Sequence, residues 1–179
     1  LTRDINASAT ASWDGGKGFN PIGATGSGLA ESFTGRFYGR GHVINGLRIN
    51  RPDEDEGTGL FRYLWGEGEI VHLNLEDCSV TGRDNVGGLV YAVSESGTVF
   101  GCHVTGSVTG ASADSSYIGG LIGANYGTVC DSYTTCSDVA NGFYGGGLAG
   151  ANYGVILRCR SGGTVTGSGS CVGGLIGAN

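Results

Sequence analysis

The stretch GGLIGANYGTV at residues 119–129 returns almost unchanged as GGLAGANYGVI at 146–156 and as GGLIGAN at 173–179. The copies begin at positions 119, 146 and 173, which is a constant interval of 27. Short apolar runs and glycine-rich turns repeated at this interval are typical of a β-solenoid, in which each unit makes one coil. Successive coils then stack about 4.8 Å apart through parallel β-ladders. The repeat therefore predicts an all-β fold of stacked coils, with two or three strands in each coil.

The tripeptide Gly-Gly-Leu marks four such units. Its members are Gly87, Gly88 and Leu89; Gly119, Gly120 and Leu121; Gly146, Gly147 and Leu148; and Gly173, Gly174 and Leu175. The intervals between successive leucines are 32, 27 and 27 positions, and a looser copy at 57–61 places Leu60 another 29 positions upstream. Because glycine has no Cβ, we expect the backbone to bend, or another segment to approach closely, at each pair.

Alternation of side chains along each strand assigns the coil interior. The inward positions of one unit are Leu148, Ile156, Cys159 and Val165, and their expected neighbours in the preceding coil are Leu121, Val129, Ser132 and Val139. We therefore expect columns of aliphatic side chains along the solenoid axis.

One polar position repeats with the same register. Asn125, Asn152 and Asn179 each come at the fourth position after a repeat leucine. Asparagine tolerates left-handed backbone, and its amide can bond along a stack of identical residues. We interpret these residues as a structural ladder at a turn.

Composition excludes several other classes. The 179 residues include 38 Gly but only 2 Pro, which does not fit collagen, and the hydrophobic fraction of 39% is too high for a disordered linker. Methionine is absent and Lys17 is the single lysine, which disfavours a helical bundle. A net charge of −6 disfavours nucleic acid as a partner, and the chain lacks the long apolar run of a membrane span.

The charge is unevenly distributed along the chain. Residues 115–179 hold only Asp131, Asp138, Arg158 and Arg160, which cancel. A nearly uncharged surface is unusual for a protein exposed to solvent on all sides. We therefore expect this region to make lateral or end-to-end contacts.

Residues 84–179 resemble the GLUG-type repeats of large bacterial surface proteins, through the motif GGL-(I/A)-G-A-N-(Y)-G-x-(V/I). The N-terminal half, with GFNPIG at 18–23 and GLFRYL at 59–64, is similar to the segment that often precedes such repeats. The resemblance implies a right-handed parallel β-helix of the filamentous-haemagglutinin type, with repeats of about 27–32 residues. It divides the chain into a lead-in with first coils at 1–56 and a GGL-repeat solenoid at 57–179. YAVSES at 91–96 departs from the GANYG turn and marks a local change of loop.

The search for catalytic motifs yields no nucleophile elbow, Walker loop or HExxH zinc motif. His42, His72 and His103 are isolated in sequence, so we expect structural or exposed roles and no metal or cofactor. The acidic run at 53–56 is expected to be a solvated turn. A β-helix polysaccharide lyase or hydrolase needs paired carboxylates, and Asp131 and Asp138 form no acidic column with the next unit.

The six cysteines fall into two groups. Cys102 and Cys159 share a register with Ser132 between them, which predicts buried thiols two coils apart, and Cys78 is also expected to point inward. Cys171 is expected at a turn. Cys130 and Cys136 lie in one unit, outside the column of Cys102, Ser132 and Cys159. The sequence does not decide whether they form a disulfide with each other or with a neighbouring coil.

These features favour a non-catalytic segment of an extracellular or cell-surface adhesin or fibre, in which the stacked coils form a stiff rod. Its expected partners are further copies, neighbouring subunits, continuation of the same chain, or a host or surface glycan. Two alternatives stay open: a carbohydrate-active β-helix enzyme, and a scaffold region of a larger surface protease.

Overall fold

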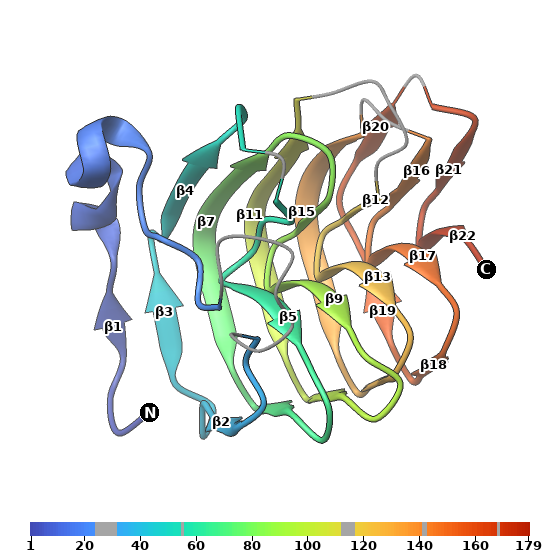
Figure 1. Cartoon of the computed structure of the whole chain (residues 1–179), viewed down its shortest axis with the longest axis horizontal. Helices are drawn as coiled ribbons and strands as arrows, with labels where there is room; N and C mark the ends of the chain where they lie inside the picture. The colour runs from blue at the N-terminus through green and yellow to red at the C-terminus, as the bar shows by residue number, and fades with distance from the viewer. Residues whose placement is uncertain (24–31, 55, 112–116, 141–142, 168) are drawn as a thin grey trace.

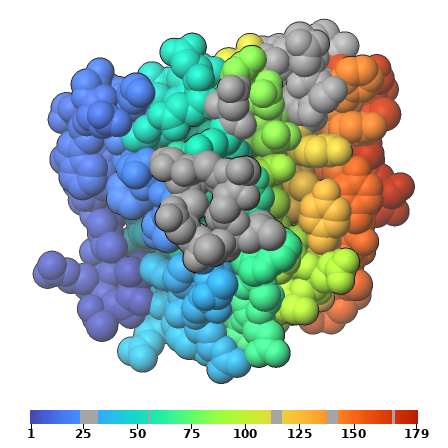
Figure 2. All heavy atoms as spheres, viewed as in Figure 1, coloured from blue at the N-terminus to red at the C-terminus, as the bar shows by residue number. Residues whose placement is uncertain are grey.

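In the computed structural model the chain is an all-β solenoid of about five turns. The structure describes residues 1–23, 32–54, 56–111, 117–140, 143–167 and 169–179, with the side chains of 138–140 left out. The coils lie side by side in chain order, from the N-terminus at the left of Figure 1 to the C-terminus at the right. The same order appears as successive bands of colour in the space-filling view (Figure 2). The predicted β-solenoid is thus confirmed.

Each full coil contributes to four parallel sheets, which we number I to IV in the order that the chain visits them. Sheet I contains β2 (Arg36–Tyr38), β6 (Glu69–Val71), β10 (Thr98–Phe100), β14 (Thr128–Cys130) and β18 (Val155–Leu157). Sheet II contains β1 (Ile5–Asn6), β3 (Val43–Asn45), β4 (Arg48–Arg51), β7 (Asn74–Gly82), β11 (His103–Gly110), β15 (Tyr133–Ala140), β19 (Arg160–Ser161) and β20 (Val165–Gly167).

Sheets III and IV come from the GGL region of each unit. Sheet III contains β8 (Val86–Gly87), β12 (Tyr117–Gly119), β16 (Tyr144–Gly146) and β21 (Cys171–Gly173). Sheet IV contains β5 (Phe61–Leu64), β9 (Val90–Val93), β13 (Ile122–Asn125), β17 (Ala149–Asn152) and β22 (Ile176–Ala178). The expectation of two or three strands per coil is therefore wrong, because the chain turns at each glycine pair and divides the GGL region between two sheets.

The strand register follows the sequence repeat. From β12 onward, paired residues are 27 positions apart, as in Tyr117 with Tyr144 and Ile122 with Ala149. The stacking of Val129 on Ile156 is confirmed. The expected pairing of Val139 with Val165 is wrong by one residue. Val165 pairs with Asp138, and Val139 pairs with Thr166.

The core is a continuous column of aliphatic side chains inside the coils. Leu89, Leu121 and Leu148 are fully buried, and the main-chain N–H of each donates to the carbonyl of the repeat leucine in the next coil. Leu175, in the last coil, is 37% exposed because no further coil in the structure covers it. At the other end, a short 3-10 segment, η1 (Ser8–Gly16), lies beside β4 (Figure 1), where the Thr10 hydroxyl accepts a hydrogen bond from the Arg48 N–H.

Glycines allow sheets III and IV to approach closely. A Cβ added to Gly119 would lie 2.7 Å from the main-chain nitrogen of Gly150, and one added to Gly146 would lie 2.7 Å from that of Gly177. The second glycine is also crowded where a further coil covers it, since a Cβ on Gly88 would lie 2.4 Å from the Gly120 carbonyl oxygen. In the last coil it is not, because a Cβ on Gly174 would meet no atom within 4 Å. Where one coil covers another, no side chain fits between the backbones at these glycines.

The acidic run at 53–56 is not simply a solvated turn. The carboxylate of Glu54 lies 2.6 Å from Arg51 Nη1 and 3.3 Å from Arg62 Nη2, and Glu56 lies 2.8 Å from Arg62 Nη1. Arg62 projects from β5 and its side chain is completely buried. A buried guanidinium requires paired carboxylates, so this acidic segment is held against sheet IV.

The cysteines occupy both expected and unexpected positions. Cys102 is buried, and its N–H donates to the Ser132 hydroxyl, while Cys159 packs partly buried against the core. Cys171 lies within β21, paired with Tyr144, and not at a turn as expected. Among the cysteines, all of which lie in described segments, the structure contains no disulfide; Cys130 is partly exposed in β14 and Cys136 is buried in β15.

Candidate functional site

The asparagine positions form a ladder of side-chain amides. Asn125 Nδ2 donates to Asn152 Oδ1 at 2.8 Å, and Asn152 Nδ2 donates to Asn179 Oδ1 at 2.7 Å. Asn125 is fully buried, and its Oδ1 also accepts the N–H of Gly127 at 3.1 Å. Asn125 and Asn152 are buried inside the stack, so the ladder joins coils there.

The outer surface near sheets III and IV carries most of the tyrosines. Tyr117 stacks on Tyr144 with ring centroids 5.3 Å apart, and Tyr126 stacks on Tyr153 at 5.0 Å. Both pairs are nearly parallel, with interplanar angles of 14° and 15°. We call these four residues the tyrosine patch. A hydrogen bond of 3.4 Å between the Tyr117 and Tyr153 hydroxyls joins its two stacks.

The phenols of this surface interact with one another electrostatically. The hydrogen bond with Tyr153, together with burial and neighbouring phenols, raises the pKa of Tyr117 to about 12. Burial, followed by the influence of Tyr63 and other neighbouring phenols, raises the pKa of Tyr91. Tyr91 meets Tyr63 edge-on at 5.1 Å. Tyr117 and Tyr91 therefore stay neutral at ordinary pH, and their rings offer apolar surface with a hydroxyl group at the edge.

Sequence reasoning missed this surface as a site, although a signal was present. Tyr117 and Tyr144, like Tyr126 and Tyr153, lie 27 positions apart, which is the repeat interval itself. In a solenoid, identical residues one repeat apart stack on one face. The repeated tyrosines therefore predict two aromatic stacks once the fold is known.

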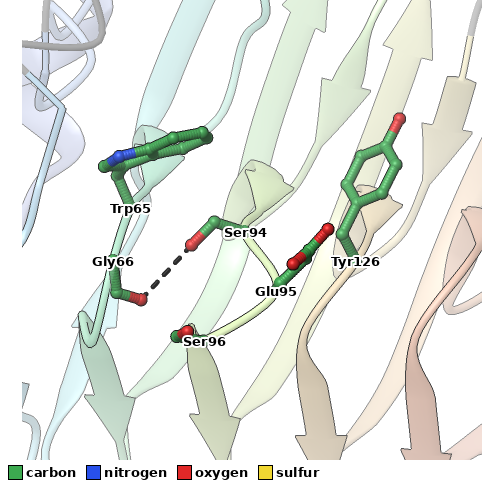
Figure 3. A pocket seen from close by; sticks show the side chains of 6 residues that line it. All are labelled: Trp65, Gly66, Ser94, Glu95, Ser96 and Tyr126. Atoms are coloured by element: carbon green, nitrogen blue, oxygen red, sulfur yellow. Dashed lines mark hydrogen bonds between the residues drawn. The ribbon is translucent and has the colours of Figure 1, made fainter.

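A cleft opens at the turn from sheet IV to sheet I, between the exposed rings of Trp65 and Tyr126 (Figure 3). Its volume is about 500 Å³, and its lining consists of Trp65, Gly66, Ser94, Glu95, Ser96 and Tyr126. Trp65 and Tyr126 are 41% and 44% exposed. Ser94 lies between them along the stack, and its hydroxyl donates to the Gly66 carbonyl at 3.3 Å. The departure noted in sequence at 91–96 is thus the segment that shapes this cleft.

Each of the three histidines contacts a neighbouring side chain. His103 stacks on Tyr133 at 3.7 Å, and the guanidinium of Arg160 covers the other side of that ring. His42 bonds to Asp4 at 3.0 Å, and His72 meets Phe100 edge-on. Within the part of the chain that the structure describes, no three His, Cys, Asp or Glu side chains gather as a metal site would require. The described segments also contain no helix of the length and hydropathy needed to cross a bilayer.

Comparison with known proteins gives one relevant relative. The chain is 41% identical over 137 residues to Halomucin of Haloquadratum walsbyi (strain DSM 16790 / HBSQ001). The match covers 75% of this chain but only 1% of that protein, so the chain corresponds to a very small part of its length. No protein-family model and no solved structure matches the chain, and the GLUG-type assignment is accordingly not confirmed. The solenoid fold and this relative fit a repeat region of a large surface protein.

Proposed function

We propose that this chain is a non-catalytic segment of a cell-surface or extracellular protein, and that its stacked coils act as a stiff rod with a contact surface. The observation that carries the proposal is the repetition of one register from coil to coil. The repeat leucine, the crowded glycines and the asparagine ladder recur at the same place in successive coils. A coil built in this way can stack on another coil without changing its own structure.

The distribution of charge supports a role in contact. Asp131 and Arg158 form two hydrogen bonds of 2.6 Å with each other, so these two charges in the C-terminal coils offset one another. The same coils carry the exposed rings of Tyr126 and Tyr153. Self-association, a neighbouring subunit or a surface glycan would suit such a surface, whereas a basic nucleic-acid-binding face would not form from it.

Coil-on-coil contact is tested by light scattering and electron microscopy over a range of protein concentrations. We expect end-to-end assemblies, because Leu175 is exposed where equivalent leucines are buried. Leu175→Asp should abolish them by placing a charge on the stacking surface. Ser170→Asp, the same charge change at an exposed position of the same coil, should not. A wild-type chain that stays monomeric at every concentration would contradict this part of the proposal.

The enzymatic alternative is tested separately with a panel of polysaccharides. Glycoside hydrolysis uses two carboxylates on either side of the scissile bond. Among the described residues that line the cleft, Glu95 is the single carboxylate. We therefore expect no release of reducing or unsaturated sugars, and release of either that is lost in Glu95→Gln would overturn the non-catalytic assignment.

A further inference from the structure

The cleft at Trp65 and Tyr126 arises because a small residue lies between these two aromatic residues at the same turn position of successive coils. Leu64, Val93 and Asn125 pair across three successive coils, so the residues that follow them share one turn position. Those residues are Trp65, Ser94 and Tyr126. In the next coil the position is Tyr153, which stacks directly on Tyr126. The small side chain of Ser94 therefore leaves a space between two aromatic rings that are two coils apart.

The size of this space suits a group larger than a single atom. Two coils correspond to about 9–10 Å along the axis, and the cleft volume is about 500 Å³. Figure 3 shows Trp65 and Tyr126 on opposite sides of the cleft, with the Glu95 side chain next to Tyr126. A compact group placed there would have an aromatic ring on either side and a carboxylate beside it.

The charge of the cleft is negative. Glu95 is exposed in the lining, and Glu67 is exposed on the adjoining turn. Within the described part of the chain, no lysine or arginine lines the cleft and neither carboxylate has an ion pair. By contrast, nearby Glu69 is paired with Arg36 at 3.3 Å. Glu95 therefore lies among aromatic side chains without a counter-charge.

Aromatic faces and a carboxylate together recognise an organic cation. The negative face of an aromatic ring attracts a cation within about 6 Å of its centroid, with tryptophan the strongest partner, and aromatic cages bind quaternary ammonium groups in this way. A bare metal ion is less suitable, because it would need several oxygen ligands and the described lining supplies a single carboxylate. We propose that this cleft binds a quaternary ammonium group, held between Trp65 and Tyr126 and neutralised by Glu95. This inference goes beyond the proposed function and does not depend on it.

The binding test uses the fluorescence of Trp65. The chain has two tryptophans, so Trp13→Phe leaves Trp65 as the sole reporter. Trp13 lies in η1 at the N-terminal end, away from the cleft. We expect choline chloride to change the fluorescence saturably, with a dissociation constant on the order of 1 mM. The neutral isostere dimethylbutanol, in which carbon replaces the ammonium nitrogen, should bind at least about tenfold more weakly. Sodium chloride at equal ionic strength corrects for screening.

Two variants and a matched control assign the binding to these residues. In the Trp13→Phe background, Glu95→Gln and Tyr126→Leu should each weaken choline binding by about fivefold or more. Asp77→Asn makes the same charge change at an exposed position on sheet II and should leave binding within about twofold. Circular dichroism checks that each variant keeps its fold.

Three results would overturn the proposal. The first is equal binding of choline and its neutral isostere, and the second is choline binding that Glu95→Gln leaves unchanged. The third is a response to neutral disaccharides with none to choline, which would make the cleft a saccharide site.

Discussion

The crowded glycines determine how closely neighbouring sheets can pack. A Cβ on Gly119 would lie 2.1 Å from the Ile122 carbonyl oxygen as well as 2.7 Å from the Gly150 nitrogen. Both neighbours are backbone, so neither can rotate away as a flexible side chain would. Gly174, the second glycine of the last GGL, has no atom within 4 Å of its added Cβ. The second glycine of the motif is therefore restricted in an earlier coil, where a Cβ on Gly147 would lie 2.4 Å from the Gly174 carbonyl oxygen, and open in the last coil.

Substitution of Gly119 tests this restriction. We expect Gly119→Ala to lower the free energy of unfolding by about 2–3 kcal/mol, because the backbones must move apart. Urea denaturation monitored by circular dichroism measures the change. Gly174→Ala is the control and should shift stability by no more than about 0.5 kcal/mol. Equal effects of the two substitutions would show that close sheet packing is not what selects glycine.

The buried Arg62 makes stability sensitive to pH. Burial alone would raise the pKa of Glu54, but its hydrogen bonds and charge interactions with Arg51 and Arg62 outweigh this and lower the pKa below 4.5. A carboxyl whose pKa is depressed in the folded state stabilises the fold above its unfolded pKa. That contribution is lost as the pH falls through the folded pKa.

Glu54→Gln tests this contribution. At neutral pH it should cost about 1–2 kcal/mol, since Glu54 is partly exposed and Arg62 keeps its contact with Glu56. The unfolding free energy of the variant should also fall less steeply than that of the wild type between about pH 5 and pH 3. Asp53→Asn, an equal charge change at an exposed neighbour, is the control. If the unfolding free energies of wild type and Glu54→Gln changed with pH in parallel, the Glu54 carboxylate would not be a source of the pH dependence.

At the scale of elements, each coil is held to the next by main-chain ladders and by the asparagine column. Asn125 connects three elements, because it bonds to Asn152 in β17, accepts from Gly127 at the following turn and donates to the Val155 carbonyl in β18. One coil earlier, the same register position is Val93. The ladder is therefore a feature of the C-terminal coils, where the sequence repeat is also most regular.

Loss of the buried amide should weaken this junction. Asn125→Ala is expected to lower the unfolding free energy by about 1–3 kcal/mol, because the buried N–H of Gly127 loses its acceptor. Asn179→Ala, at the exposed end of the same ladder, should cost no more than about 0.5 kcal/mol. Thermal and urea unfolding of both variants measure the difference. An Asn125→Ala variant as stable as Asn179→Ala would mean that the column is not structural.

The sequence predicted the coils better than the path within each coil. The leucine spacing and the asparagine register depend on exact repeats, and both could be read directly. The division into sheets III and IV could not, because it depends on how tightly Gly119 approaches Gly150 in the next coil. The pairing of Glu54 with Arg62 was missed for the same reason, since these residues come together only through the fold. Likewise, the cleft follows from Ser94, a small residue at the turn position where Trp65 and Tyr126 lie in the coils on either side.

At the scale of the whole molecule, the solenoid has two dissimilar ends. The N-terminal end is covered by β1 and η1, where Ala7 and Thr10 are buried (Figure 1). At the C-terminal end, Val172 and Leu175 are exposed. Along the side, aromatic rings and the acidic cleft are carried on a rigid stack. This arrangement suits a rod that makes contacts along its length.

If the chain is one in-register stack of parallel coils, backbone amide protons of paired strands lie close together, and solution NMR measures these contacts. We expect contacts at the repeat interval throughout the C-terminal coils, for example Ala124 with Ala151 and Ala151 with Ala178. Between the preceding coils the interval in sheet IV should be longer, as for Ala92 with Ala124. Antiparallel hairpins would instead give contacts in which one residue's number rises as its partner's falls, and that pattern would rule out a stack of parallel coils.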